Sequence, residues 1–219
     1  MSKTVYELTE KVHAIIINPY LTWDSFNANC ELIKKYNIRN ISTSLNYIDF
    51  LKNAFNNYKI NINALISYPF ADLPFSFIKE FISYAKDKGA NGIEFTPNFI
   101  NLSNKNLDTF GIEIETFKAS ELPVTIIINK SKLEKELFVK AIEISLELGM
   151  TNFQFGDGFG SPISPLDVSE ILKLIGKQNL IKVVGGIKTF NQVIELFDAG
   201  INCVGTSSFC EIFEEVKVF

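Results

Sequence analysis

Two charged side chains interrupt otherwise apolar, strand-like segments of this sequence. Lys182 lies within L-I-K-V-V-G-G, and Glu94 lies within G-I-E-F-T. A buried charge is costly unless it is paired or functional, and buried lysines are a usual source of amines with altered pKa values. A carboxylate beside an amine can also act as a general acid or base. We therefore expect the two side chains to meet. The alternatives are a purely structural ion pair, or a lysine at the wet rim of the fold.

A third polar residue, Gln154, interrupts the apolar segment N-F-Q-F. Its amide can donate and accept hydrogen bonds, but it can act neither as a nucleophile nor as a base.

Glycine and hydroxyl residues cluster directly after the last three strand-like segments. The clusters are G-D-G-F-G at 156–160, the pair at 185–186 and G-T-S-S at 205–208. Glycines let backbone N–H groups approach an anion, and serines add hydroxyl donors. Loops favour both residue types for other reasons, so each cluster alone is weak evidence. Together they predict a phosphate site formed by Gly158, Gly185, Gly186, Ser207 and Ser208.

Other chemistries find little support in the sequence. His13 is the only histidine, and we interpret it as structural. No His, Cys and Asp residues have the spacing of metal ligands, and no Ser-His-Asp set is evident. Cys30, Cys203 and Cys210 form no C-x-x-C pair and are expected to be buried free thiols. We therefore predict neither a metal nor a cofactor.

These residues need a scaffold, and the sequence alternates between apolar runs and amphipathic stretches. The runs are continuous rather than alternating, as in parallel strands buried on both faces. The expected strands cover 12–17, 38–44, 60–69, 92–97, 124–129, 152–156, 180–184 and 203–206. The expected helices cover 23–36, 74–88, 132–148, 165–175 and 190–199.

The ends of several helices carry capping signals. Ser164 before Pro165 is typical of an N-cap followed by proline at the first helical position. Ser131 and Glu134 have the spacing of a capping box. Glycine follows three helices immediately before the next strand, where a left-handed backbone conformation ends a helix. These glycines are Gly89, Gly149 and Gly200.

Eight strand–helix units in 219 residues predict a (β/α)₈ barrel, the TIM-barrel fold. We expect one domain over residues 1–219, in which about residues 1–11 form a short polar N-terminal segment. A doubly wound open sheet is the alternative. It would usually have a G-x-G-x-x-G turn after its first strand, but the first strand here is followed by N-P-Y.

Charge and composition limit the partners. The formal net charge is −4, and no block of lysine or arginine occurs, so neither nucleic acid nor a membrane is an expected partner. No apolar run approaches the roughly 18 residues of a membrane span. The N-terminus lacks the features of a signal or transit peptide. We expect a cytoplasmic protein, or a stromal one if it is organelle-encoded, and the sequence allows a homodimer.

The last third of the chain resembles the deoxyribose-phosphate aldolase family, and weaker similarity covers nearly the whole chain. Residues 181–189, I-K-V-V-G-G-I-K-T, resemble the family's V-K-x-x-G-G-I-R-T, and 204–208 resemble I-G-T-S-S. Residues 65–69 are similar to V-I-G-F-P, and 92–95 to E-I-D-M/V. Family members are class I aldolases that attack a sugar phosphate carbonyl with a lysine. The resemblance implies that Lys182 is the second active-site lysine and that Glu94 replaces the catalytic aspartate.

The departures from the family pattern fall in the catalytic centre. Strand six of the family reads F-V-K-T-S-T-G-F-G, and its lysine forms the Schiff base. Here Gln154 takes that place. Thr125 stands where the family has lysine, Asn129 where it has glutamate, and His13 and Ile15 where an Asp-x-Thr/His pattern is expected.

Three hypotheses follow from these comparisons. The first is a barrel that binds a small phosphorylated sugar or aldehyde, with ordinary aldolase activity lost or altered. The second is an active carbon–carbon lyase that uses Lys182. The third is a non-covalent acid/base isomerase that uses Glu94 and Lys182.

Overall fold

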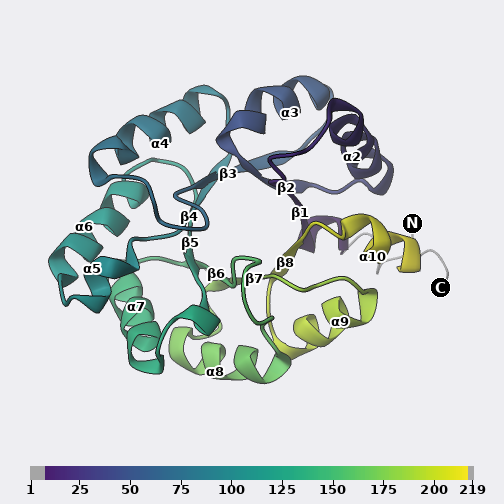
Figure 1. The fold of residues 1–219 in the computed structure, drawn as a ribbon. Coiled ribbons are helices and arrows are strands. Elements are labelled where there is room, and N and C mark those ends of the chain that lie inside the picture. The colour runs from purple at the N-terminus through teal and green to yellow at the C-terminus, as the bar shows by residue number, and fades with distance from the viewer. Residues whose placement is uncertain (1–7, 217–219) are drawn as a thin grey trace.

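The strands close into a parallel barrel in sequence order. A computed structural model describes residues 8–216, and β8 pairs with β1 to complete the ring (Figure 1). The (β/α)₈ TIM barrel predicted from the sequence is confirmed, and the open sheet is excluded. The strands are β1 Val12–Ile16, β2 Asn40–Ser44, β3 Asn61–Ile66, β4 Gly92–Phe95, β5 Val124–Ile128, β6 Asn152–Phe155, β7 Leu180–Val184 and β8 Cys203–Thr206.

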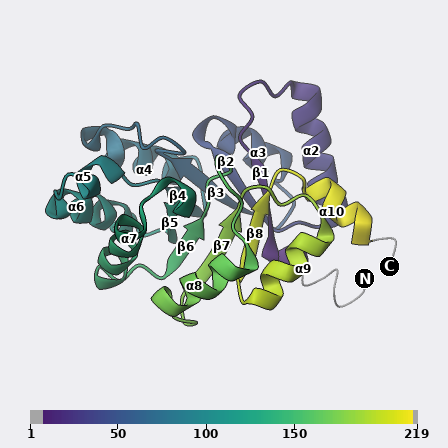
Figure 2. The same ribbon diagram turned by 60° about the horizontal axis from the view of Figure 1, so that its bottom comes forward.

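Helices surround the barrel, and α10 completes the ring between α9 and α2 (Figure 1, Figure 2). They are α2 Trp23–Tyr36, α3 Ile48–Ala54, α4 Ile78–Asp87, α5 Phe99–Ser103, α6 Leu107–Lys118, α7 Lys135–Glu147, α8 Pro165–Ile175, α9 Phe190–Ala199 and α10 Phe209–Val216. Three 3₁₀ helices are η1 Leu45–Tyr47, η2 Phe75–Phe77 and η3 Lys130–Lys132. No helix within residues 8–216 has both the length and the apolar character needed to cross a bilayer.

Most predicted helices are confirmed, but one cap is wrong. Ser164 accepts a hydrogen bond from Asp167 N–H in a full capping box, and the three predicted glycines have positive φ. By contrast, Ser131 lies in η3, and Glu134 is an N-cap without a side-chain hydrogen bond. The reason is local, because the Ser131 hydroxyl donates instead to Asn129 Oδ1. The expected helix ranges do not include those of α3, α5, α6 and α10.

The expected polar segment at 1–11 is only partly described, since 1–7 lie outside the described residues. Residues 8–11 are helical, and Leu8 and Thr9 are buried. The Thr9 carbonyl accepts from Arg39 N–H, and the Asn40 side chain donates to the Glu10 carbonyl. This part of the segment therefore packs against the start of β2.

Aromatic contacts show which strand faces point outward. Phe95 of β4 stacks on Phe117 of α6 with 3.9 Å between ring centroids, and Phe155 of β6 contacts Phe138 of α7. Adjacent strand residues point to opposite faces. Glu94 and Gln154 must therefore point into the barrel, where the expected chemistry would lie.

One buried carboxylate on the helical layer gives the fold a pH dependence. Glu113 of α6 accepts a hydrogen bond from Asn98 N–H at 3.0 Å and so holds the loop between β4 and α5. Burial raises the pKa of Glu113 from 4.5 to about 6, against the opposing effect of this hydrogen bond. Between these values the native chain binds more protons than the unfolded chain, so stability from this group falls as pH rises.

We predict that Glu113→Gln removes this component of the pH dependence. In the unchanged protein, the Glu113 contribution to the unfolding free energy should fall by about 2 kcal/mol between pH 4.5 and pH 7. Urea unfolding at both pH values measures the difference. The exposed Glu115 on the same helix provides the matched control, Glu115→Gln. An unchanged pH dependence in Glu113→Gln would contradict the assignment.

Candidate functional site

A buried ion pair crosses the interior of the barrel. Lys182 Nζ of β7 donates to Glu94 Oε1 of β4 at 2.7 Å and to Ser42 Oγ of β2 at 2.8 Å. Ser42 Oγ in turn donates to Glu94 Oε1 at 2.9 Å. Lys182 is 1% exposed and Glu94 2%. The predicted meeting of the two charges is confirmed, and a lysine at the wet rim is excluded.

Polar side chains surround this ion pair, and some of their buried atoms have no hydrogen-bond partner among the described residues. Glu94 Oε2, Gln154 Oε1 and His13 Nδ1 are buried without a hydrogen-bond partner among the described residues. Burial lowers the pKa of His13 well below its usual value, and the positive charge of Lys182 lowers it further. Burial also raises the pKa of the Cys203 thiol to about 12. His13 and Cys203 are therefore uncharged near neutral pH and add no further charge to the pair.

Gln154 lies beside Lys182 in the register of β6 and β7. Its side chain is buried, and Gln154 Nε2 donates to the Gly156 carbonyl at 3.0 Å. The amide thus binds the first residue of the loop that follows its own strand.

All five residues of the predicted phosphate site line one cavity of about 420 Å³ at the C-terminal ends of the strands. The cavity is bordered by Gly158, Gly185, Gly186, Ser207 and Ser208. Lys188 carries the only charge among the described residues that line it. The start of α10 also borders the cavity, and a helix N-terminus favours anions. One expected donor is already used, because Ser208 N–H donates to Thr206 Oγ1 at 2.9 Å.

The ion pair lies beneath this cavity rather than on its surface. Gly205 lines the cavity, and a Cβ atom placed on it would be 2.9 Å from Lys182 Cε. Lys182 therefore packs directly under Gly205, while neither Lys182, Glu94 nor Gln154 lines the cavity. The structure brings the predicted phosphate residues together and places the predicted catalytic residues one layer deeper.

Asp157 anchors the loop between β6 and α8. Its buried carboxylate accepts from Asn129 Nδ2 at 2.6 Å, Phe159 N–H at 2.9 Å and Lys132 Nζ at 2.9 Å. Tyr68 Oη donates to the Asp157 carbonyl at 2.5 Å. Asp157 thus holds this loop through both its side chain and its backbone carbonyl.

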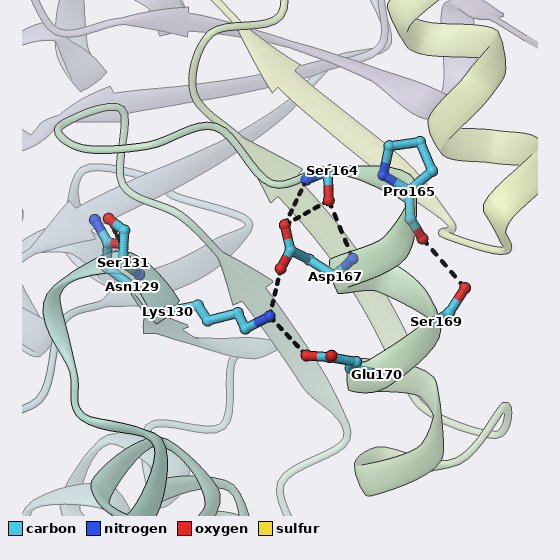
Figure 3. Close-up of polar contacts among 8 residues, drawn as sticks. All are labelled: Asn129, Lys130, Ser131, Ser164, Pro165, Asp167, Ser169 and Glu170. Carbon is cyan, nitrogen blue, oxygen red and sulfur yellow. Dashed lines mark hydrogen bonds and ion pairs between the residues drawn. The ribbon is translucent and has the colours of Figure 1, made fainter.

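The same loop is held at its far end by Lys130. Its ammonium group contacts Asp167 and lies 2.8 Å from Glu170 Oε2, which ties the end of β5 to the first turns of α8 (Figure 3). Asp167 also completes the capping box with Ser164. The signal for this anchor was the polar run N-K-S-K directly after strand five.

Sequence reasoning missed two residues of the cavity, Tyr68 and Lys188. Both lie inside segments that carry the family resemblance, but neither was singled out. Burial raises the pKa of Tyr68, and the charges of Asp157 and Glu94 raise it further, so the phenol stays protonated. Within residues 8–216, no group of three or more His, Cys, Asp or Glu side chains could hold a metal ion.

Comparison with known proteins supports the aldolase resemblance over nearly the whole chain. A deoxyribose-phosphate aldolase from Dictyoglomus turgidum is 28% identical over 206 residues, which cover 93% of this chain and 94% of the relative. The solved structure of QR15, an aldolase, has a TM-score of 0.88 at 19% identity and covers 99% of this chain and 97% of its own. A tetrameric deoxyribose phosphate aldolase from Aeropyrum pernix has a TM-score of 0.85 at 15% identity, covering 99% and 93%. No family model matches the chain.

We predict that the two charges in the barrel are strongly coupled. Glu94→Gln leaves a buried ammonium without its counter-ion, and Lys182→Met leaves a buried carboxylate, so each should lower the unfolding free energy by about 3–5 kcal/mol. The double variant should lose clearly less than the sum, because it removes both charges. Denaturant unfolding of all four proteins measures the coupling. Additive losses would show that the two groups stabilise the barrel independently.

Proposed function

We propose that this chain binds a small phosphorylated sugar or aldehyde at the C-terminal mouth of its barrel and does not cleave it through a Schiff base. The observation that carries the proposal is the separation of the anion cavity from the interior lysine. The cavity presents backbone donors, hydroxyl groups and Lys188. The lysine beneath it is held by Glu94 and Ser42.

The electrostatics of the cavity favour an anion. No acidic side chain lines it among the described residues, and Lys188 contributes a positive charge. Gly185 has a φ of 109°, and a Cβ atom there would lie 3.2 Å from Gly158 Cα. The two loops therefore approach one another through glycine backbones, which leaves room for N–H groups to face a phosphate.

The covalent step of a class I aldolase requires an uncharged amine that can reach a carbonyl carbon. At the position of the family's Schiff-base lysine, Gln154 supplies an amide. Lys182 is engaged in two hydrogen bonds and packs below Gly205. These features support loss of the ordinary aldolase reaction, which the curated relatives' names describe.

The two alternative activities make different demands on the same residues. A lyase that uses Lys182 would have to break its bond with Glu94 and bring the amine into the cavity, which Lys182 does not line. An acid/base isomerase would have to expose Glu94, which is buried. Incubation with deoxyribose 5-phosphate and borohydride, followed by intact mass, distinguishes them. A covalent adduct supports the lyase, and turnover without an adduct supports the isomerase.

We predict that phosphate affinity depends on Lys188 and Ser207. Lys188→Glu reverses the single charge of the cavity, and Ser207→Asp adds a carboxylate to it, so each should weaken binding of deoxyribose 5-phosphate by about tenfold or more. Lys188→Arg keeps the charge and should bind nearly normally. Calorimetry measures the affinities. Equal binding by all four proteins would place the phosphate elsewhere.

We predict that Gln154→Lys restores covalent trapping without efficient turnover. The new lysine would stand next to Lys182, whose positive charge should lower its pKa and leave more neutral amine to attack a carbonyl. Thr125 and Asn129 still differ from the family pattern, and misplacement by about 1 Å can cost about 100-fold in rate. Borohydride trapping with deoxyribose 5-phosphate and intact mass detects the adduct.

The matched control for this experiment is Gln154→Met, which has similar length and no amine. Neither it nor the unchanged protein should form an adduct at position 154. A folded Gln154→Lys protein without any adduct would show that the pocket no longer admits a carbonyl to this strand. Efficient cleavage by the unchanged protein would overturn the proposed function.

A further inference from the structure

A second cavity of about 630 Å³ adjoins the anion cavity and is lined mainly by aromatic and other apolar side chains. Its aromatic residues are Trp23, Tyr47, Phe50, Tyr68, Phe70 and Phe159. No Asp, Glu, Lys or Arg residue lines it among the described residues. The rings of Trp23, Tyr47, Phe50 and Phe70 do not line the phosphate cavity, so that site does not account for them.

Four of the aromatic residues form two contacting pairs, one from α2 and α3 and one from two loops. In the first pair, Trp23 at the start of α2 and Phe50 of α3 have ring centroids 4.6 Å apart at an interplanar angle of 69°. In the second, Phe70 of the loop after β3 and Phe159 of the loop after β6 have centroids 6.2 Å apart. Two helices and two loops therefore contribute rings to one hollow.

These rings remain accessible to solvent. Trp23 is 58% exposed, Phe50 43% and Phe70 73%. Clustered apolar exposure of this kind is unfavourable in water and marks binding surfaces. A concave, mostly apolar pocket with few polar groups is also the usual form of a small-molecule site.

The polar groups of the second cavity are too few for a sugar ring. Tyr47 Oη already donates to the Asn18 carbonyl, and Tyr68 Oη donates to the Asp157 carbonyl. Only Ser44 and Asn46 add further polar side chains. Sugar hydroxyls buried here would lose their hydrogen bonds to water without replacement. A flat aromatic ring has no such cost and can pack edge-to-face against the exposed rings.

The two cavities adjoin one another at the mouth of the barrel. Ile17, Leu21, Tyr68 and Phe159 line both of them. A single molecule can therefore place a phosphate against the loops after β7 and β8 and direct its other end toward the two aromatic pairs.

We propose that the two cavities together bind an aromatic phosphate ester, with its phosphate in the first cavity and its ring in the second. The proposal rests on the phosphate site of the proposed function and adds, to the short phosphorylated sugars and aldehydes, a class of ligand that also fills the second cavity. It predicts a preference for phosphate esters that carry a ring over the short sugar phosphates that fit the first cavity alone.

The test compares probes that differ in one part at a time. 2-Phenylethyl phosphate carries both parts, 2-phenylethanol lacks the phosphate, glycerol 3-phosphate lacks the ring, and 2-cyclohexylethyl phosphate has a ring without aromatic faces. Calorimetry gives the affinities. Trp23 is the only tryptophan in the chain and lines the second cavity, so its fluorescence reports directly on occupancy there.

We expect 2-phenylethyl phosphate to bind about tenfold more tightly than glycerol 3-phosphate and about threefold more tightly than the cyclohexyl ester. It should also shift the Trp23 emission. Phe50→Ala and Phe70→Ala should each reduce the tenfold preference while leaving glycerol 3-phosphate binding unchanged. The matched control is Phe81→Ala, which removes a 37% exposed ring on α4 that lines none of these cavities.

The outcomes separate the two proposals. If 2-phenylethyl phosphate and glycerol 3-phosphate bind equally and Trp23 emission does not change, the aromatic ligand is excluded and the phosphate site stands. If 2-phenylethanol binds as tightly as its phosphate ester, the phosphate site fails while the aromatic pocket remains. If the cyclohexyl ester binds as tightly as the phenyl ester, the pocket selects bulk and the aromatic assignment is wrong. Binding of none of the probes overturns both proposals.

Discussion

The buried ion pair between Lys182 and Glu94 constrains the positions of the strands that surround it in the barrel. Two charges taken out of water must remain close together, because separating them leaves an uncompensated charge in a medium of low polarity. With Ser42 as a third partner, the pair connects β7, β4 and β2 through the interior. A lysine held in this way is a fixed positive charge beneath the mouth of the barrel.

The mouth of the barrel is formed by loops that hydrogen bonds and ion pairs from neighbouring segments hold in place. Asp157 is bonded by Asn129, Lys132 and Tyr68, and Lys130 reaches α8 from the end of β5. This bracing sets where the glycine-rich loop after β6 meets the loop after β7. It also presents Phe159 to the solvent beside Tyr68. On this fold, the loop residues that shape the mouth of the barrel differ from the strand residues in its interior. Ligand binding by the loops can therefore change in evolution without a change in the residues on the strands.

Much of this architecture is determined by local sequence. Continuous apolar runs separated by amphipathic stretches predict parallel strands with helical crossovers, and their number predicts a closed barrel. Polar residues within those runs identify the interior positions Glu94, Gln154 and Lys182. Glycine and serine after the last three strands identify residues that line one cavity at the mouth of the barrel. Each of these signals lies within a single element, so it can be read without knowing what packs against that element.

Only the tertiary structure determined how deeply the site residues are buried and which residues they contact. The sequence places Lys182 within β7, but only the folded barrel sets it against Gly205 of the neighbouring strand and outside the lining of the cavity. Ser131 could have capped α7, but its hydroxyl is taken by Asn129. The aromatic hollow combines Trp23 of α2 with Phe159 of the loop after β6, which are far apart in sequence. These outcomes depend on the closure and stagger of the whole barrel, which set distances between residues of different strands and loops. No local pattern encodes those distances, because they arise only when β8 pairs with β1.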